Sequence, residues 1–326
     1  MDMRQLRYFV QIVESTSLAK ASRQLFIAQP ALSQHMAQLE EEVGKPLLVR
    51  SSRGVTPTDN GLALYHHAKF MLRQLDQAVS VARQDTAALS GRVTIGLAPT
   101  TTCQLGLPLI RHMREKLPGI MVNVVEGLSG HLEHMTRVGQ LDLTVLFNQK
   151  AAAELTVEPL LEEELFVIVP KASTLVAPGR ESLTLAEAAK LPLILPSPGH
   201  GLRKRIAMEF DRANLVIDAR AEIDSLPLLM HLVADGAGAT IKPMAAIHAL
   251  DNPSAWRALP LADAAMTRIN YLYSLRDEKL SACASVVRDE LRSLVRRLVD
   301  SGQWQGVRLS TSAPAEAQAS DEAVLS

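Results

Sequence analysis

The sequence has few of the residues that define several large classes of protein. Two of its 326 residues are cysteine and 4% are aromatic. Cys103 and Cys283 lie far apart and lack the close spacing of metal ligands, so we expect reduced thiols in a cytoplasmic protein. The scarcity of aromatic rings argues against a protein that binds single-stranded nucleic acid by stacking.

Long apolar runs and an excess of one charge are also missing. No run approaches the roughly 18 apolar residues of a membrane span. The charges at Asp2, Arg4 and Arg7 are unlike the start of a signal peptide. The formal net charge is −1, so any contact with nucleic acid must be local. The length suits two or three domains.

Residues 18 to 43 carry the most informative pattern. Their apolar residues repeat at helical spacing, first at Leu18, Ala21 and Leu25, and then at Leu32, Met36, Leu39 and Val43. Pro30 suits the first turn of the second helix, and Gly44 suits a left-handed cap at its end. Two short helices joined in this way predict a helix-turn-helix, whose second helix enters the major groove of double-stranded DNA.

We expect the polar face of the second helix to contact base edges, because glutamine and serine can pair with them. Two β-prone runs then surround a Ser/Arg/Gly turn, which predicts a hairpin wing whose arginines hold phosphates. The predicted DNA-binding residues are Gln29, Pro30, Ser33, Gln34, Gln38, Arg50 and Arg53.

The alternative for this segment is an ordinary all-helical core, in which helix pairs with small polar faces are common. Residues 1–58 carry seven Lys/Arg and five Asp/Glu, a net charge of +2 that is a weak signature of DNA binding. The order of parts favours DNA binding all the same, because the helices and wing precede a long helix.

Residues 59–89 contain no proline and predict that long helix. Apolar or small residues recur with heptad spacing at Ala68, Leu72, Leu75, Val79, Ala82, Thr86 and Leu89. Such a seam indicates pairing between two copies of the chain, with Leu72, Leu75 and Val79 at the centre of the dimer contact. Packing of the helix against its own domain is the alternative.

From residue 90 onward strands alternate with helices, which predicts parallel α/β layers. The expected strands are 92–97, 120–126, 141–147, 156–160, 165–169, 193–195, 217–223, 239–241 and 269–275. The expected helices are 105–117, 130–138, 202–213, 226–235 and 282–299. Residues 303–326 are rich in Ser, Ala, Glu and Gln, and we expect a disordered tail.

Several loops of this region could form a ligand site, because open parallel sheets bind ligands at the carboxyl ends of their strands. The first is Pro99 to Thr102, where hydroxyls and helix N–H groups could cradle a carboxylate or another oxyanion. Comparable loops are 127–130, 147–148, 197–201 and 224–225. Each could equally be a capped helix or an ordinary turn. Enzyme signatures are weak: there is no P-loop, nucleophile elbow or complete dinucleotide fingerprint.

The N-terminal segment resembles the LysR-type transcriptional regulators. The matching stretches are MRQLRYF (3–9), SLAKASRQL (17–25), AQPALSQ (28–34), LEEEVG (39–44), LLVR (47–50) and RGVTPT (53–58). The residues in these stretches are similar to those of the subgroup that includes nitrogen-assimilation and cysteine-biosynthesis regulators. Ala28 departs from the pattern, since many relatives have Ser or Thr there, and it removes an N-cap hydroxyl worth roughly 1 kcal/mol.

The resemblance implies a fold and a domain order. It implies an all-α winged helix-turn-helix with a long linker helix, followed by an α/β effector domain like the periplasmic binding proteins. The expected bounds are 1–58 for the DNA-binding domain, 59–89 for the linker helix and 90–302 for the effector domain. Subdomain I comprises 90–161 and 266–302, and subdomain II comprises 162–265. The chain would cross between them near 160–165 and return near 261–269.

The resemblance also implies a function and an effector site. The chain would be a regulator that binds an interrupted palindrome as a homodimer or homotetramer, with RNA polymerase as a further partner. It would need no cofactor beyond a small-molecule effector in the cleft. The implied effector-binding residues are Thr100, Thr101, Thr102, Ser129, Phe147, Ser197, His200 and Ile241. The rival is a solute-binding or metabolic α/β protein whose N-terminal helices mediate protein contacts, and an enzyme is a distant third.

Overall fold

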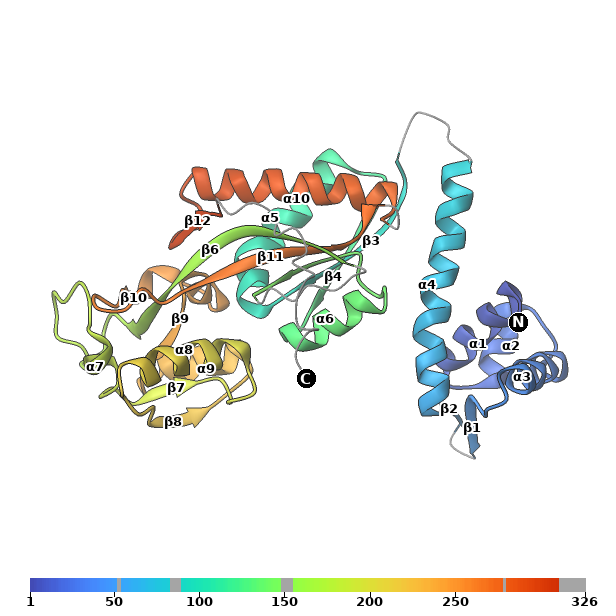
Figure 1. Cartoon of the computed structure of the whole chain (residues 1–326), viewed down its shortest axis with the longest axis horizontal. Coiled ribbons are helices and arrows are strands. Elements are labelled where there is room, and N and C mark those ends of the chain that lie inside the picture. The colour runs from blue at the N-terminus through green and yellow to red at the C-terminus, as the bar shows by residue number, and fades with distance from the viewer. Residues whose placement is uncertain (52–53, 83–88, 148–154, 278–279, 311–326) are drawn as a thin grey trace, which may run out of the picture. The chain divides into compact units, whose positions relative to one another are not determined.

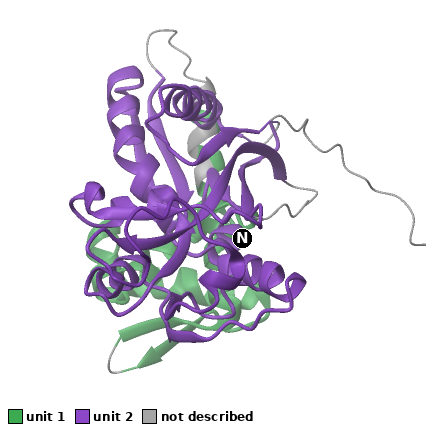
Figure 2. Cartoon of the chain, turned by 90° about the vertical axis from the view of Figure 1, so that its left-hand side faces the viewer, with its two compact units in different colours: residues 1–88, 137–140 green, residues 89–136, 141–326 purple. Residues whose placement is uncertain are grey.

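The computed structural model describes residues 1–51, 54–82, 89–147, 155–277 and 280–310. The chain divides into two compact units, one of residues 1–88 with 137–140, and one of residues 89–136 with 141–326 (Figure 2).

The first unit begins with three helices, a hairpin and a long helix (Figure 1). In chain order these are α1 (Met3–Ser15), α2 (Leu18–Leu25), α3 (Gln29–Val43), β1 (Leu48–Ser51), β2 (Gly54–Pro57) and α4 (Asp59–Ala82). The helix-turn-helix prediction holds for α2 and α3, and the wing prediction holds for the antiparallel pair of β1 and β2. Of the apolar residues predicted to face the core, Leu32, Met36 and Leu39 are buried. Val43 is 40% exposed, because α3 ends there, beyond its packing partners.

The join between α3 and the wing is held by one acidic side chain. Oε1 of Glu40 accepts hydrogen bonds from the backbone N–H groups of Leu47 (2.7 Å) and Leu48 (3.0 Å). The N–H of Val55 in β2 donates to the carbonyl of Thr16 (2.9 Å), which ties the wing to the turn between α1 and α2. Glu40 therefore orders the wing, whereas the sequence shows it only as part of an acidic run.

The start of α4 approaches that join closely. Gly61 lies in its first turn, and a Cβ atom there would lie 1.9 Å from the carbonyl oxygen of Leu47. Further along, Ala68 is fully buried against Leu6 and Val10 of α1, and Leu72 packs on the same cluster. The alternative reading of the heptad therefore holds for this part of the seam, which packs within its own unit.

The second unit is a mixed α/β structure. Its first half contains β3 (Gly91–Leu97), α5 (Pro99–Lys116), β4 (Ile120–Glu126), α6 (Ser129–Arg137), β5 (Leu143–Leu146), β6 (Leu155–Pro170) and α7 (Leu185–Ala188). The rest contains β7 (Leu193–Leu195), α8 (Gly201–Arg212), β8 (Ala219–Glu222), α9 (Leu226–Ala234), β9 (Thr240–Pro243), the short 3-10 helices η1 (Met244–Ala249) and η2 (Pro253–Ala255), β10 (Trp256–Leu259), β11 (Thr267–Leu275), α10 (Ala282–Asp300) and β12 (Val307–Leu309).

The main sheet has the strand order β10-β6-β11-β5-β3-β4, with β9 and β12 also paired to β6. The pairs of β3 with β4 and β5 are parallel, but β11 runs antiparallel to β5 and β6, so the prediction of parallel layers holds for only part of the sheet. β7 and β8 form a separate parallel pair. Helices α5 and α10 contact each other and β3.

Strand β6 crosses between the two halves of this unit beside β11, and the chain returns between β10 and the start of β11 at Thr267 (Figure 1). Its residues 155–164 pair with β11, and its residues 165–170 pair with β9 and β10. The expected crossing therefore lies within one strand of 16 residues, and the prediction of two strands, 156–160 and 165–169, is wrong.

Residues 303–310 are not a disordered tail. Trp304 is 2% exposed, and β12 pairs antiparallel with Leu161–Glu163 of β6. Gly306 lies against Phe166 and Met244, so the segment packs beside the crossing strand. The remainder of the predicted tail, 311–326, lies outside the described residues.

Candidate functional site

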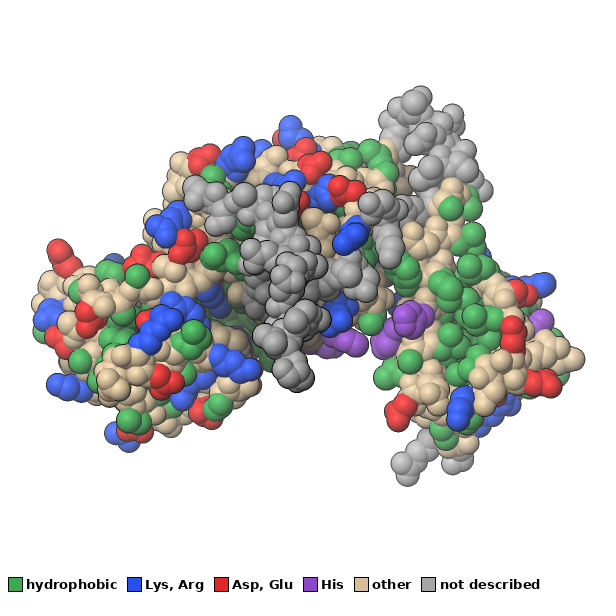
Figure 3. Space-filling view, in the orientation of Figure 1, with side chains coloured by type: hydrophobic (Ala, Val, Ile, Leu, Met, Phe, Trp, Pro, Cys, Tyr) green, Lys and Arg blue, Asp and Glu red, His purple; other side chains and the backbone are tan. Residues whose placement is uncertain are grey.

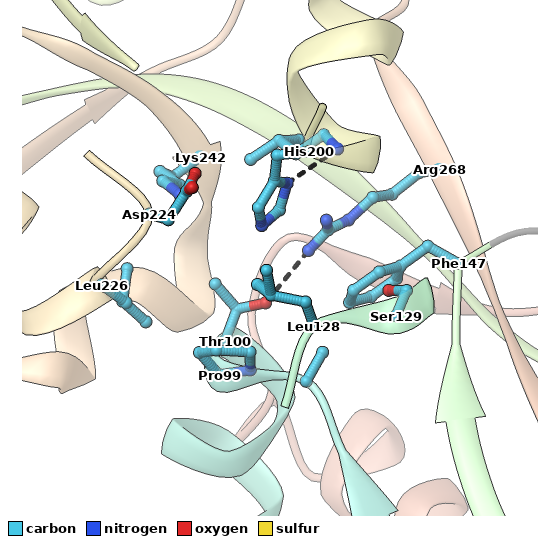
Figure 4. Close-up of a pocket in the computed structure, with 12 residues that line it drawn as sticks. Pro99, Thr100, Leu128, Ser129, Phe147, His200, Asp224, Leu226, Lys242 and Arg268 are labelled. Atoms are coloured by element: carbon cyan, nitrogen blue, oxygen red, sulfur yellow. Dashed lines mark hydrogen bonds between the residues drawn. The ribbon is translucent and has the colours of Figure 1, made fainter. Parts of the chain in front are cut away.

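A cleft of about 350 Å³, including its part open to solvent, lies in the second unit where four helices begin (Figure 4). Its wall comes from the starts of α5, α6, α8 and α9, with further residues from β9, β11 and the end of β5. The lining residues are Ala98, Pro99, Thr100, Leu128, Ser129, Phe147, His200, Leu202, Asp224, Leu226, Lys242 and Arg268.

The helix starts give this cleft a positive potential. Each helix begins with backbone N–H groups that have no partner inside the helix, and its dipole is positive at that end. Ala98 caps α5 and Ser225 caps α9, and neither side chain accepts a hydrogen bond from the helix. N–H groups at both starts therefore remain available to a ligand, and the arrangement favours an anion.

One wall of the cleft carries a neutralised cation, Arg268 of β11. Its Nε donates to Oε1 of Glu163 in β6, and its Nη2 donates to Oγ1 of Thr100 (3.1 Å). Its guanidinium carbon lies 3.5 Å from the centre of the Phe147 ring. Arg268 and Glu163 are 7% and 2% exposed, so the ion pair is buried. Arg268 is thus held by three partners, and its charge is balanced within the protein.

The opposite wall carries Lys242 of β9, beside Asp224 (Figure 4). Burial, and secondarily the charge of Arg268, lowers the pKa of Lys242 to about 7, while Asp224 acts to raise it. Asp224 accepts hydrogen bonds from the N–H and the hydroxyl of Ser197, both at 3.0 Å. The bond from the Ser197 N–H is the main reason why the pKa of Asp224 lies below its ordinary value.

His200 lies between these two walls, at the N-cap of α8. Its Nδ1 accepts a hydrogen bond from the N–H of Leu202 (3.1 Å). Burial, followed by the charges of Lys242 and Arg268, lowers the pKa of His200 to about 4. The imidazole is therefore neutral near pH 7 and can offer a ligand its other ring nitrogen as an N–H donor.

The structure brings some of the predicted effector residues together and not others. Thr100, Ser129, Phe147 and His200 line the cleft, and Ser197 lies behind Asp224. The other three predicted residues are Thr101, Thr102 and Ile241.

These three residues do not line the cleft. Thr101 is 2% exposed, and the hydroxyl of Thr102 donates to the carbonyl of Ala98 (3.1 Å) within α5. Ile241 is fully buried in the core formed with Val167 and Leu193, because its neighbour Lys242 takes the cleft-facing side of β9. The expectation that Ile241 lines the cleft is therefore wrong.

The two cations of the cleft, Lys242 and Arg268, were not predicted from the sequence. Both are charged residues in buried strands, where charge is rare, and that mismatch is the one signal that could have revealed them. Asp224 lies in one of the loops that the sequence indicated.

Five of the seven predicted DNA-binding residues are exposed on the surface of the first unit. Gln29, Pro30, Gln34 and Gln38 are exposed on α3, and Ser33 is half-buried. Arg50 is exposed on β1, while Arg53 lies outside the described residues. On the face in Figure 3, acidic and basic side chains are interspersed, in agreement with the nearly balanced charge.

The predicted dimer residues differ in their surroundings. Leu72 packs partly on the α1 cluster, Leu75 is half-buried and Val79 is 41% exposed. Thr86 of the predicted heptad lies outside the described residues, and the side chain of Ala82 is likewise not described. Within the part of α4 that the structure describes, Val79 is therefore the residue of this set most open to a partner.

The part of the chain that the structure describes contains neither a metal-binding cluster nor a helix suited to span a membrane. No group of three His, Cys, Asp or Glu side chains there could hold a metal ion. Likewise, none of the described helices combines the length and the apolar character that crossing a membrane requires.

Comparison with known proteins gives the same division of the chain. Residues 3–62 match the model of the bacterial regulatory helix-turn-helix proteins of the lysR family, and residues 86–296 match the LysR substrate binding domain. The nitrogen assimilation regulatory protein nac of Klebsiella aerogenes is 37% identical over 91% of this chain and 96% of its own length. The protein of the same name from Escherichia coli is 34% identical over 94% and 99%.

Solved structures show the same fold. A full-length OxyR variant from Pseudomonas aeruginosa aligns with a TM-score of 0.74 at 21% identity, covering 96% of this chain and 99% of that one. Full-length CbnR in complex with its target DNA aligns with a TM-score of 0.68 at 18% identity, covering 91% and 99%. The family matches decide against the rival in which the N-terminal helices mediate only protein contacts. The chain belongs to the LysR family of DNA-binding transcriptional regulators, with a helix-turn-helix domain followed by an effector-binding domain.

Proposed function

We propose that this chain is a cytoplasmic regulator whose sequence-specific DNA binding is controlled by a small anionic effector in the cleft. The observation that carries the proposal is the convergence of four helix starts, Lys242 and Arg268 on one cleft. Helix N-termini and cations bind anions in many proteins. A ligand can change the protein only if it binds two conformations with different affinity. The crossing in β6 and the return to β11 are the connections between the halves of the second unit through which such a change would pass.

The domain bounds of the proposal are those expected from the sequence. The DNA-binding domain comprises 1–58, the linker helix 59–89 and the effector domain 90–302, to which the packed residues 303–310 are added. The two subdomains meet along β6.

We further propose a homodimer or homotetramer that reads an interrupted palindrome through two copies of α3. A helix-turn-helix dimer reads two half-sites, so modest contacts by each copy add up. Leu75 and Val79 of α4 are the residues proposed to meet a second copy. RNA polymerase is proposed as a further partner once the regulator is bound to DNA.

Within the DNA-binding domain we assign different roles to α3 and the wing. Gln34 and its neighbours Gln29, Ser33 and Gln38 lie on the exposed side of α3 and are proposed to read base edges, with Pro30 at its start. Arg50 and Arg53 of the wing are proposed to hold phosphates.

Gel shifts with genomic fragments at fixed salt test this assignment. Gln34→Ala is expected to reduce the difference in binding free energy between specific and nonspecific sites by roughly 1–3 kcal/mol. Arg50→Ala or Arg53→Ala is expected to weaken binding to all sequences. Either change should also reduce, by about one, the steepness with which the logarithm of the binding constant falls with the logarithm of the salt concentration. If the wild-type chain showed no sequence preference, the proposal would fail, and identical profiles for the variants would refute the division of roles.

A further inference from the structure

We propose that Lys242 is the residue that receives the effector, that the effector carries one negative charge, and that its binding takes up a proton. This inference rests on the proposed function and deepens it by naming the receptor residue and the ligand class: small monocarboxylates and anions of similar charge.

The two cations of the cleft are not equivalent. Arg268 already has the carboxylate of Glu163, the hydroxyl of Thr100 and the ring of Phe147 as partners. Lys242 is 4% exposed, and its ammonium makes no hydrogen bond or ion pair with any residue that the structure describes. A buried ammonium is costly unless it is paired. The cleft therefore has one cationic position without a direct partner, and it lies where an incoming anion can reach it.

The surroundings of Lys242 set the charge of the ligand. The charged and titratable groups that act on it are Arg268 from β11, Asp224 ahead of α9 and His200 at the start of α8. Arg268 is balanced by Glu163, and Asp224 is held by two hydrogen bonds from Ser197. His200 is neutral near pH 7. The formal charges of Lys242, Arg268, Glu163 and Asp224 therefore sum to zero when Lys242 is protonated. A ligand with one negative charge can meet Lys242 and the helix starts, whereas a second negative charge would find no further free cation and would be repelled by the carboxylate of Asp224.

The rest of the lining fits the organic part of a small carboxylate. Pro99, Leu128, Leu202 and Leu226 supply apolar surface around the polar groups. The hydroxyls of Thr100 and Ser129 lie on the same wall as Arg268 (Figure 4). A short aliphatic chain can occupy the apolar part while its carboxylate meets Lys242.

Proton uptake follows from the burial of Lys242. In the free protein the amine loses its proton near pH 7, and an anion bound beside it stabilises the charged form and raises its pKa. The affinity for the anion is therefore at its full value below pH 7 and falls as the pH rises above 7. If only the ammonium form binds, the loss is about tenfold per pH unit. His200 titrates near pH 4 and contributes little above pH 6.

The test uses butyrate and succinate, which share a four-carbon chain and differ in charge, with the full-length protein. Calorimetry between pH 6 and pH 9 is expected to show butyrate binding that is level below pH 7 and falls about tenfold per unit above it. At pH 7, titrations in two buffers of different ionisation enthalpy should show an uptake of about half a proton per butyrate. Succinate is expected to bind no more tightly than butyrate.

Three variants test whether butyrate binding and its pH dependence arise at Lys242. Lys242→Met should abolish butyrate binding, and Lys242→Arg should bind it without the fall above pH 7. Lys204→Met, which changes an exposed lysine of α8, should behave as the wild type. NMR titration of the lysine side chains should show one resonance that titrates near pH 7, is absent from Lys242→Met and shifts to higher pH with butyrate.

The inference is overturned if butyrate does not bind at pH 6, if its affinity is flat from pH 6 to pH 9, or if succinate binds tenfold more tightly. Those results leave the proposed function standing, because sequence-specific DNA binding and its response to other ligands are measured separately by gel shift. Conversely, loss of DNA specificity would defeat the proposed function without changing the butyrate titration.

Discussion

At the scale of single residues, the buried pair of Glu163 and Arg268 fixes one wall of the cleft. Removing one partner of such a pair leaves an uncompensated charge in the interior, which costs roughly 3–5 kcal/mol. The pair joins β6 to β11, and Arg268 continues to Thr100 at the start of α5. Glu163 therefore shapes the cleft without lining it.

We predict that Glu163→Gln lowers the free energy of unfolding of the second unit by an amount near the lower end of that range, because the amide retains an acceptor but not the charge. Glu162→Gln is the matched control: it removes the neighbouring carboxylate, whose partner Arg308 is 75% exposed, and should cost at most about 1 kcal/mol. Urea unfolding followed by tryptophan fluorescence reports on this unit alone, since Trp256 and Trp304 both lie in it. Equal effects of the two variants would contradict the assigned role of the buried pair.

Four of the twelve residues that line the cleft were among the predicted effector residues, namely Thr100, Ser129, Phe147 and His200. Lys242 was missed because side chains alternate between the two faces of a strand. In β9 all four residues are buried, so burial does not show which side faces the cleft, and the charge of Lys242 is the feature that marks it. The resemblance assigned Ile241, yet successive side chains point to opposite faces of a strand, and Lys242 faces the cleft instead. Thr100 and His200 were predictable because helix starts are visible in the sequence.

At the scale of elements, the approach of α4 to the wing depends on the absence of a side chain at Gly61. The carbonyl oxygen of Leu47 occupies the space of a Cβ atom, and backbone cannot move as a flexible side chain can. The backbone N–H of Leu47 also donates a hydrogen bond to the carboxylate of Glu40 in α3. The start of α4 and the end of α3 therefore both contact Leu47, at the entry to the wing, and this residue couples the three elements.

We predict that Gly61→Ala destabilises the DNA-binding unit and weakens DNA binding, because α4 must shift away from Leu47. Gly44→Asn is the control: Gly44 has a positive φ of 70° and open space around it, which asparagine tolerates. Circular dichroism should show a lower-melting helical transition for Gly61→Ala, while the fluorescence of the two tryptophans in the second unit keeps its midpoint. A melting profile of Gly61→Ala like that of Gly44→Asn would count against this coupling.

Most helices and strands were predictable at this scale, although α5 begins at Pro99 instead of residue 105 and the short elements α7, η1, η2 and β10 were not expected. Two of the failures, at β6 and at residues 303–310, have tertiary contacts as their cause. The run Glu162–Glu164 looked like a break between two strands, but β11 and β12 flank β6 there, and Arg268 and Arg308 pair with the acids. Residues 303–310 were predicted to be disordered because composition was averaged over a long polar segment. The burial of Trp304 and the pairing of β12 are tertiary effects that such a window cannot show.

At the scale of the whole molecule, control by an effector means that two binding events share a coupling free energy. If butyrate in the cleft changes the affinity for DNA by some factor, DNA must change the affinity for butyrate by the same factor. Typical couplings correspond to about 5–150-fold. The pH dependence assigned to Lys242 must then appear in DNA binding as well.

We predict that saturating butyrate at pH 6.5 shifts the dissociation constant for a specific DNA site by at least about fivefold, and that the DNA shifts the butyrate constant by the same factor. At fixed subsaturating butyrate, the shift should shrink as the pH rises from 7 to 9, because the ammonium form of Lys242 is lost. Fluorescence anisotropy of labelled DNA and calorimetry of the protein–DNA complex measure the two sides of the cycle. Lys242→Met should show no shift on either side, and Lys204→Met should keep both. A butyrate effect on DNA affinity that persists in Lys242→Met would place the coupling outside this cleft.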